Sequence, residues 1–242
     1  MILAVDIGNT AIKLAVVDDV TVYDLMRTTP DAFISNIQSI CSNYPDLRNA
    51  CVCQVGNIDI KLLDGLERLL KVTYINENSK LPFTNKYQSS TTLGHDRMAL
   101  VAGAIADGSN GKNTLIIDAG TCVTYDFIDD SNNYLGGAIS PGLRLRFESL
   151  HNFTKNLPLL KPENKVKFLG NNTKASIQSG VVKGLTFEIK GMIKKYEKNY
   201  KDLNVIITGG DADLLIKQLK NRFFATPFLM LHGIHNIYKI NS

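Results

Sequence analysis

Two stretches of this chain, ILAVDIGNTAIKLAVVDD at residues 2–19 and LIIDAGTCVTYDFIDD at residues 115–130, follow the same plan. Each begins with an apolar run typical of a β-strand, continues with Asp-x-Gly and a threonine, and ends in a second strand closed by acids. Such a turn suits a phosphate group, because glycine lets backbone amides approach its oxygens. The repeat predicts a nucleotide bound in a cleft between two similar halves, and therefore phosphoryl transfer.

The composition is that of a globular protein able to bury a core. The chain has 242 residues, of which 44% are hydrophobic and 21% charged. It contains no apolar run of transmembrane length, so we expect no membrane partner. The first residues enter a strand directly and lack the features of a signal peptide, which predicts a cytoplasmic protein.

Neither the cysteines nor the charges suggest another class of function. The spacing of Cys41, Cys51, Cys53 and Cys122 fits neither a zinc site nor a redox pair, so we expect four small buried side chains. Residues 141–242 carry 17 Lys or Arg against 7 Asp or Glu. Many of these lysines fall on one amphipathic helix, and no aromatic residues interleave with a basic stripe, so we predict no nucleic-acid partner.

The order of elements predicts an α/β protein in two similar halves. Helices with apolar spacing over 33–40 and 60–70 alternate with strands over 2–5, 11–17, 21–27, 50–55 and 72–75. A buried helix is expected over 97–106, after a polar loop over 76–92. In the second half, strands are expected over 115–118, 121–128, 134–140 and 203–208. One helix is expected to end at residue 151, and three more are expected over 173–196, 211–220 and 228–240. We expect Thr173 to be the N-cap of the long helix. A turn over 109–113 separates the expected domains, residues 1–110 and 111–242.

The turn after the first strand carries candidate phosphate ligands. Gly8 permits close approach of the backbone, Asn9 and Thr10 offer side-chain donors, and Lys13 offers a positive charge. Asp6 would be repelled by a phosphate and would therefore act through a metal ion or its water. Taken alone, Gly-Asn is equally an ordinary hairpin turn. The matching Asp118 and Thr121 favour a nucleotide site.

A different kind of motif, Gly94-His95-Asp96-Arg97, stands at the start of the apolar helix. An acid and an arginine are costly there unless they face a cavity or each other. Asp96 could accept a proton from a substrate hydroxyl, and Arg97 could bind a carboxylate. The alternative is a salt bridge at the helix start with a capping histidine, and His95 is expected to act as a local hydrogen-bonding group.

These motifs, in this order, resemble the type III pantothenate kinases. The resemblance includes Asp-x-Gly-Asn-Thr at 6–10, Gly-x-Asp-Arg at 94–97, Asp-x-Gly-Thr at 118–121, Gly-Gly-x-Ile-x-Pro-Gly at 136–142, Asn-Thr at 172–173 and Thr-Gly-Gly at 208–210. It extends over essentially the whole chain. It implies a duplicated actin-like, hexokinase-type (ribonuclease H-like) fold that works as a homodimer. Its departures include Ser90, His95 and Cys122, and also Arg144 and Arg146, where less charged residues are usual.

The resemblance also implies an activity: ATP-dependent phosphorylation of pantothenate to 4'-phosphopantothenate, the first step toward coenzyme A. Asp96 then corresponds to the general base, Asp118 to the ligand of a monovalent cation (K⁺ or NH₄⁺), and Mg²⁺ accompanies ATP. The implied ATP-phosphate ligands are Asp6, Gly8, Asn9, Thr10, Lys13 and Thr121. The implied pantothenate-binding residues are Tyr87, Gly94, His95, Arg97 and Thr173.

Three other interpretations remain open at this point. The chain could be a kinase for another small hydroxylated acceptor, such as a sugar or acetate. It could be a regulatory accessory factor, as some relatives have been described, although intact Asp6 and Asp96 favour an enzyme. It could also bind ATP without turnover.

Overall fold

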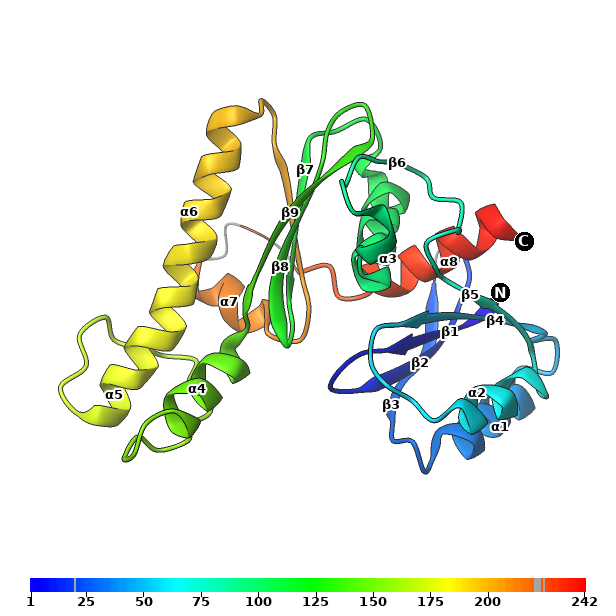
Figure 1. Cartoon of the computed structure of the whole chain (residues 1–242), viewed down its shortest axis with the longest axis horizontal. Coiled ribbons are helices and arrows are strands. Elements are labelled where there is room, and N and C mark those ends of the chain that lie inside the picture. The colour runs from blue at the N-terminus through cyan, green and yellow to red at the C-terminus, as the bar shows by residue number, and fades with distance from the viewer. Residues whose placement is uncertain (20, 220–222, 224) are drawn as a thin grey trace. The chain divides into compact units, whose positions relative to one another are not determined.

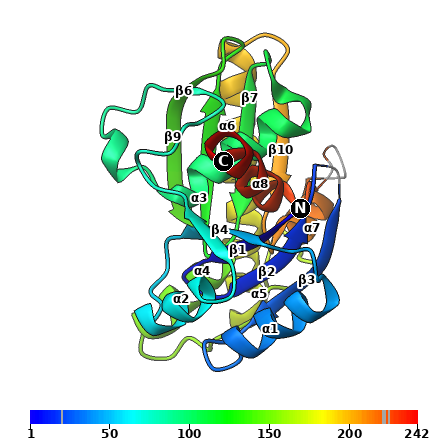
Figure 2. The same cartoon turned by 90° about the vertical axis from the view of Figure 1, so that its right-hand side faces the viewer.

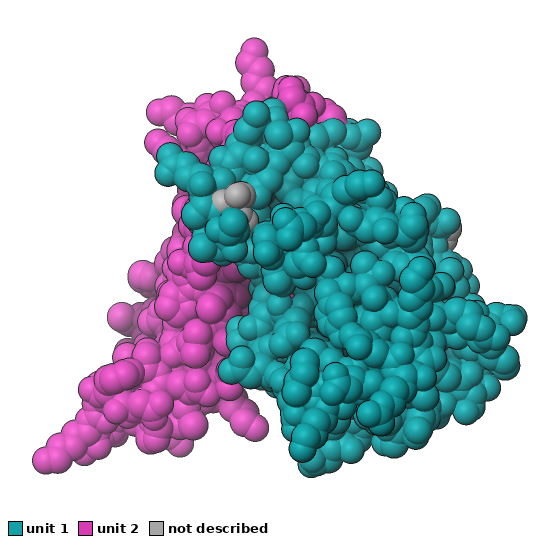
Figure 3. Space-filling view, turned by 45° about the vertical axis from the view of Figure 1, so that its right-hand side comes forward, with its two compact units in different colours: residues 1–110, 132–134, 228–242 teal, residues 111–131, 135–227 magenta. Residues whose placement is uncertain are grey.

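The computed structural model describes residues 1–19, 21–219, 223 and 225–242. The chain divides into two compact units, coloured separately in Figure 3. Unit 1 contains residues 1–110, 132–134 and 228–242, and unit 2 contains residues 111–131 and 135–227. The expected boundaries of two domains, 1–110 and 111–242, stay a prediction.

A mixed five-stranded sheet is the centre of unit 1, with strands in the order β3-β2-β1-β4-β5. These strands are β1 (Ile2–Ile7), β2 (Ile12–Val17), β3 (Val22–Thr28), β4 (Asn49–Gln54) and β5 (Lys71–Tyr74). β1 pairs antiparallel with β2 and parallel with β4. All six residues of β1 are buried, which agrees with a central strand covered on both faces.

Helices cover both faces of this sheet (Figures 1 and 2). α1 (Phe33–Asn43) and α2 (Ile60–Glu67) bury their apolar stripes against alternate residues of β1, namely Leu3, Val5 and Ile7. The other face is covered by α3 (His95–Ala104) and α8 (Leu229–Asn241), which pack against each other and on β4. Because side chains alternate along a strand, Asp6 lies on the α3 side of the sheet.

The segment between β5 and α3 is mostly irregular, as expected for the loop over 76–92. It also contains two short elements that the sequence pattern does not predict: β6 (Thr84–Asn85) and the 3₁₀ turn η1 (Ser90–Thr92). β6 pairs with the first residues of β9 (Asn133–Pro141) that lie in unit 1. A π-helical turn, η2 (Ile105–Ser109), follows α3.

Unit 2 repeats the strand arrangement of unit 1. Its strands β7 (Thr114–Ala119), β8 (Cys122–Ile128) and β10 (Asn204–Thr208) combine with β9 in the order β10-β7-β8-β9. β7 pairs antiparallel with β8 and parallel with β10, just as β1 pairs with β2 and β4. The predicted α/β class with two similar halves is confirmed.

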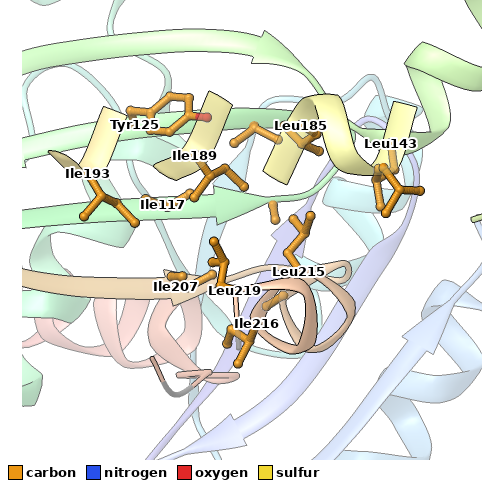
Figure 4. Packing of buried hydrophobic residues seen from close by; sticks show 14 of the residues in the cluster. Ile117, Tyr125, Leu143, Leu185, Ile189, Ile193, Ile207, Leu215, Ile216 and Leu219 are labelled. Carbon is orange, nitrogen blue, oxygen red and sulfur yellow. The ribbon is translucent and has the colours of Figure 1, made fainter. Parts of the chain in front are cut away.

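One face of the second sheet carries a large apolar core (Figure 4). Odd-numbered strand residues such as Ile117 and Ile207 meet Leu185 and Ile189 of α6 (Gly184–Asn199) and Leu215 of α7 (Ala212–Gln218). Each fully buried aliphatic side chain of this kind contributes about 1.5–3 kcal/mol. Asp118 belongs to the even-numbered set and so lies on the opposite face, as Asp6 does in unit 1.

The long helix predicted over 173–196 is present with an interruption. It consists of α5 (Thr173–Gln178), the π-helical turn η3 (Ser179–Lys183) and α6, and the backbone at both junctions stays helical. The prediction that Thr173 is the N-cap is wrong. Asn172 is the N-cap, because its Oδ1 accepts a hydrogen bond from the Ala175 amide at 2.9 Å.

Other expected elements are found with small differences. α4 (Leu143–Asn152) follows the Pro-Gly turn, and α8 corresponds to the helix predicted over 228–240. The helix predicted over 211–220 ends at Gln218, and Lys220 lies outside the described residues. Cys51 and Cys53 are buried as expected, whereas Cys41 and Cys122 are only half-buried. None of the helices in the described chain combines the length and apolar character of a transmembrane span.

Candidate active site

The turn between β1 and β2 holds the first group of predicted ligands. The Gly8 amide donates to the Ala11 carbonyl at 3.1 Å, which closes the turn and leaves Asn9 and Thr10 exposed at its tip. Asp6 is buried, and its Oδ2 lies 2.9 Å from Nζ of Lys13, directly opposite on β2. The turn therefore presents polar side chains and backbone to solvent above an ion pair in which Asp6 is buried and Lys13 is partly exposed.

Gly56, which no sequence motif marks, packs directly against this turn. A Cβ at Gly56 would lie 2.3 Å from the Gly8 carbonyl oxygen, so only glycine fits there. The amides of Val55 and Gly56 both donate to the Ile7 carbonyl, at 3.0 and 2.9 Å. The end of β4 is thus fixed to the end of β1.

Unit 2 has the same construction around Asp118. Gly209 follows β10 with a φ of 97°, and a Cβ there would lie 2.4 Å from Oδ1 of Asp118. A Cβ at Gly142 would lie 2.2 Å from the Gly120 carbonyl oxygen, and the Gly142 amide donates to the Thr121 carbonyl at 3.0 Å. Glycine is therefore required at position 142, after β9, and at position 209, after β10, because both residues pack closely against the turn between β7 and β8.

The face of unit 2 that carries Asp118 also carries Thr124, a threonine whose side chain is buried. Thr124 is the antiparallel partner of Asp118, so the two side chains lie on one face with Cβ atoms about 4.5–5.5 Å apart. The Thr124 hydroxyl is buried, and within the described ranges it has no hydrogen-bond partner. A buried hydroxyl of this kind is a candidate ligand for an ion beside the carboxylate.

Asp96 lies in the first turn of α3, where Gly94 is the N-cap residue. Its Oδ1 accepts a hydrogen bond from the Arg97 amide at 2.8 Å. A Cβ at Gly94 would lie 2.4 Å from the same oxygen, so the glycine makes room for the carboxylate. Burial raises the pKa of Asp96, and the nearby charge of Asp6 raises it further.

Arg97 favours the ionised form of Asp96, but it opposes the upward pKa shift only in part. The Arg97 amide and its positive charge do lower the pKa of Asp96, but burial outweighs both, so the net direction is upward. The proximity of Asp6 and Asp96 also places the first turn and the start of α3 in one region of unit 1.

His95 forms a hydrogen bond, though not a local one. Its Nδ1 lies 3.1 Å from the Gln54 carbonyl oxygen, at the end of β4 and 41 residues away in sequence. The Gln54 side chain donates to the Gly56 carbonyl at 3.0 Å. His95 thus connects the start of α3 to the segment that packs against the first turn, and it does not cap the helix.

Arg97 is almost fully buried, and its guanidinium lies over two neighbouring aromatic rings. Its Cζ is 5.6 Å from the ring centroid of Tyr87 and 5.8 Å from that of Tyr134. Tyr134 was expected only as the start of a strand. No motif marks it in the sequence, because its role depends on the pairing of β9 with β6.

Thr173 and Thr121 belong to unit 2, as does Asp118. Thr173 is exposed in the first turn of α5, and Thr121 is half-buried in the second turn. Arg146, one of the departures from the family pattern, has a structural partner: its Nη2 lies 2.5 Å from Oε2 of Glu188 on α6. Arg144 forms an i,i+4 pair with Glu148.

Both units contain a sheet with the same strand order, β3-β2-β1-β4 in unit 1 and β9-β8-β7-β10 in unit 2. In both, an aspartate and a glycine stand at the turn after the central strand. This duplication defines an α/β protein with a ribonuclease H-like core. A model of the type III pantothenate kinase family matches residues 2–195. The chain belongs to this family, and the resemblance predicted from its motifs is confirmed.

Relatives of nearly equal length support the assignment. A type III pantothenate kinase from Flavobacterium johnsoniae is 43% identical over 239 residues, which cover 99% of this chain and 98% of the relative. Another from Christiangramia forsetii is 42% identical over 242 residues, covering 100% and 99%. One from Bacteroides fragilis is 38% identical over 243 residues, with the same coverage.

Solved structures agree on the fold. A conserved putative Baf family transcriptional activator from Campylobacter jejuni has a TM-score of 0.65 at 20% identity, covering 99% of this chain and 98% of that one. An activator of 2-hydroxyisocaproyl-CoA dehydratase from Clostridium difficile has a TM-score of 0.55 at 14% identity, covering 99% and 94%. At these identities the likeness concerns the fold alone.

Proposed function

We propose that this protein transfers the γ-phosphoryl group of ATP to the primary hydroxyl of pantothenate, giving 4'-phosphopantothenate, the first step toward coenzyme A. The observation that carries the proposal is the start of α3. There an aspartate with a raised pKa stands next to an arginine packed on Tyr87, in a chain that belongs to the family over nearly its whole length.

Asp96 is proposed as the general base. A base for an alcohol must lie within about 2.6–3.2 Å of the hydroxyl and be ionised at the working pH. Burial raises the pKa of Asp96, which makes the ionised carboxylate a stronger base. Gly94 allows the carboxylate to turn back over the helix start, so its orientation is fixed before substrate arrives.

Arg97 is proposed to bind the carboxylate of pantothenate, with Tyr87, Gly94, His95 and Thr173 as further contacts. A guanidinium offers two parallel donors that match a carboxylate. Neighbouring residues on a helix point about 100° apart, so Asp96 and Arg97 can serve different ends of one extended substrate. His95 supports them from the end of β4.

ATP is proposed to be held through its phosphates by the first turn, with Asp6, Gly8, Asn9, Thr10 and Lys13, and by Thr121 of the second turn. Mg²⁺ fits this arrangement, since it is usually bound by one or two carboxylates together with phosphates and water. In the described ranges no three His, Cys, Asp or Glu side chains gather into a metal site of their own. Asp6 would meet Mg²⁺ directly or through a water molecule of the ion.

A monovalent cation, K⁺ or NH₄⁺, is proposed to bind at Asp118. The donor set fits, because the buried Thr124 hydroxyl faces the same side of the sheet and has no protein partner in the described chain. When bound, such an ion offsets part of the negative charge of the phosphates. We therefore add Thr124 to the proposed ligands.

The protein is proposed to work as a cytoplasmic homodimer, without nucleic-acid or membrane partners. Unit 2 exposes an apolar patch formed by Phe168, Leu169 and Phe187, whose side chains are 72%, 81% and 52% accessible. Aromatic and aliphatic groups exposed to this extent are typical of a surface covered by a subunit. Sedimentation should give a dimer mass, and a Phe187→Asp variant that leaves this mass unchanged would exclude the patch as the interface.

The proposed substrate is tested by acceptor-dependent release of ADP. The protein is incubated with ATP, Mg²⁺ and K⁺, together with pantothenate, N-acetylmannosamine, glucose or acetate in separate reactions. Only pantothenate is expected to accelerate ADP release. Preference for a sugar or acetate would assign a different kinase activity, and ATP binding without release in any reaction would favour a regulatory or binding role.

A further inference from the structure

We infer that Tyr134 is a positioning residue for recognition of the substrate carboxylate. Together with Tyr87 it forms a pair of neighbouring aromatic rings against which the Arg97 guanidinium packs, and this contact orients its donors. The inference deepens the proposed function and rests on it, since the carboxylate in question is that of pantothenate.

The geometry of Arg97 is that of a cation held by two rings. Its Cζ lies within about 6 Å of both ring centroids, the range in which a guanidinium is attracted by an aromatic ring. The centroids of the two rings are 6.0 Å apart, at an interplanar angle of 41°. Because Arg97 is only 5% accessible, the attraction acts in partly desolvated surroundings, where it is strongest.

The two rings differ in exposure, which suggests different roles. Tyr87 is half-buried, so its ring can also contact a ligand. Tyr134 is fully buried, and its ring packs against Phe83 at a centroid distance of 5.9 Å. Tyr134 is therefore the fixed side of the pair, and its effect on substrate passes through Arg97.

The backbone of Tyr134 fixes the segment that carries Tyr87. Tyr134 pairs with Asn85 in the short β6–β9 ladder, and its carbonyl accepts from the Lys86 amide at 3.0 Å. The Asn85 side chain in turn accepts from the Tyr87 amide at 2.9 Å. Tyr134 thus contacts Arg97 with its ring and holds the segment that carries Tyr87 with its backbone.

An aromatic ring is a suitable neighbour for a guanidinium that binds an anion. A ring face orients a guanidinium by electrostatic attraction without cancelling its charge. A glutamate or aspartate at position 134 would form a bidentate pair with Arg97 and compete with the substrate carboxylate. Tyr134 therefore contributes to the orientation of Arg97 without adding a competing negative charge.

The test compares pantothenate with pantothenyl alcohol, in which a CH₂OH group replaces the carboxylate. For a Tyr134→Leu variant, kcat/KM for pantothenate is expected to fall about tenfold, mostly through KM, which is the size of a lost cation–π contact. The value for the alcohol should stay within about twofold, because that ligand has no carboxylate for Arg97. Equal losses for both substrates, or no loss for either, would overturn the inference.

Two further variants separate positioning from folding. Phe127→Leu is the matched control, since Phe127 is a buried aromatic on β8 that packs on Tyr196 and Tyr200; it should lower stability without changing the substrate preference. If Tyr134→Leu does not fold, position 134 is compared with phenylalanine and with pentafluorophenylalanine, which has a similar shape and a reversed ring charge distribution. The preference for pantothenate should survive the first replacement and be lost in the second; an equal preference in both would overturn the inference.

Measurements on the wild-type protein distinguish failure of the proposed function from failure of the inference about Tyr134. If calorimetry and turnover show that it neither binds nor phosphorylates pantothenate, the proposed function has failed and the inference with it. If the wild type binds and phosphorylates pantothenate, but substitutions at position 134 do not change the preference for pantothenate over pantothenyl alcohol, only the inference has failed.

Discussion

Burial acts on the two charged residues at the start of α3 in different ways. For Asp96 it raises the pKa, and the neighbouring Arg97 only partly opposes this effect. For Arg97, whose charge is permanent, burial is accompanied by contacts with the rings of Tyr87 and Tyr134. One residue is thereby suited to accept a proton and the other to attract an anion.

The role of Asp96 predicts a selective loss of turnover on substitution. An Asp96→Asn variant should lower kcat by about 10²–10⁴-fold, the usual contribution of a general base. Its melting temperature at neutral pH should be unchanged or higher, because burial disfavours the ionised carboxylate. Steady-state kinetics and thermal unfolding measure the two quantities.

The pH dependence and a control complete this prediction. Because the base must be ionised, the acidic limb of kcat/KM should lie above the ordinary aspartate value of about 3.9, and the variant should lose it. Asp64→Asn, an exposed carboxylate on α2, should leave kcat unchanged. A wild-type rate retained by Asp96→Asn would remove this residue from the role of base.

At Thr124 the predicted effect depends on the cation. Thr124→Val removes a hydroxyl without a protein partner in the described chain, so stability without K⁺ should be equal or higher. The wild type should gain stability with K⁺, by about 2.7 kcal/mol at 100 times Kd, and the variant should lose most of this gain. Denaturant unfolding at constant ionic strength measures both.

Thr186→Val is the matched control for this prediction. Thr186 is buried on α6, but its hydroxyl donates to the Val182 carbonyl at 2.7 Å. This variant should be less stable under all conditions and should keep the full response to K⁺. An unchanged response to K⁺ in Thr124→Val would exclude Thr124 as a ligand.

At the scale of elements, α3 is positioned by backbone contact with α8. A Cβ at Gly233 of α8 would lie 1.7 Å from the Ala99 carbonyl oxygen, and a Cβ at Gly103 of α3 would lie 2.1 Å from the Leu229 carbonyl oxygen. Glycines therefore allow the two helices to approach so closely. The helix that carries Asp96 and Arg97 is held by this contact.

A single methyl group should disturb this packing. Gly233→Ala is expected to cost about 1–3 kcal/mol of unfolding free energy, because the clash is with backbone and cannot be relieved by a side-chain rotation. Gly191→Ala in α6, with no atom within 4 Å of the added Cβ, should instead stabilise by about 0.5–1 kcal/mol. Urea denaturation compares the two, and equal effects would contradict the proposed contact.

A pH-dependent ion pair joins α8 to η2, the turn that follows α3. Nδ1 of His232 on α8 lies 2.8 Å from Oδ1 of Asp107, just after α3, and this hydrogen bond raises the pKa of His232. A raised histidine pKa stabilises the fold fully below the unfolded value of about 6.5 and loses this effect as the pH rises through the folded value.

Removing the pair should therefore matter most at low pH. Asp107→Asn is expected to cost about 0.5–1 kcal/mol at pH 6, a modest amount because both groups are partly exposed, and clearly less at pH 8.5. Thermal unfolding at the two pH values measures the difference. A loss that does not vary with pH would show that the pair contributes no charge interaction.

Most elements could be predicted from the sequence because their patterns are local. The apolar run of residues 2–5, predicted as a strand, and the stripe Phe33, Ile37 and Ile40 specify their own conformation. β6 could not be found in this way, since two residues become a strand only through pairing with β9. The N-cap of α5 was misassigned because Asn172 and Thr173 are both good caps, and only the geometry selects one.

For the whole molecule, the repeat seen in the sequence is a repeat of topology. Asp6 and Asp118 occupy equivalent positions at the ends of β1 and β7. In each unit a glycine that follows the adjacent parallel strand packs closely at this end: Gly56 against Gly8, and Gly209 against Asp118. The motifs were sufficient to predict these turns and the family. Gly56, Thr124 and Tyr134 escaped prediction, because their roles come from contacts between segments far apart in the chain.

The central claim is that this chain joins the γ-phosphoryl group of ATP to the primary hydroxyl of pantothenate. The most direct measurement is mass spectrometry and ³¹P NMR of the product formed with ¹⁸O-labelled γ-phosphate ATP, Mg²⁺ and K⁺. The account predicts one labelled phosphate on the primary hydroxyl of pantothenate, formed in equal amount to ADP. Labelled inorganic phosphate with unmodified pantothenate, or a phosphate on the carboxylate, would contradict it.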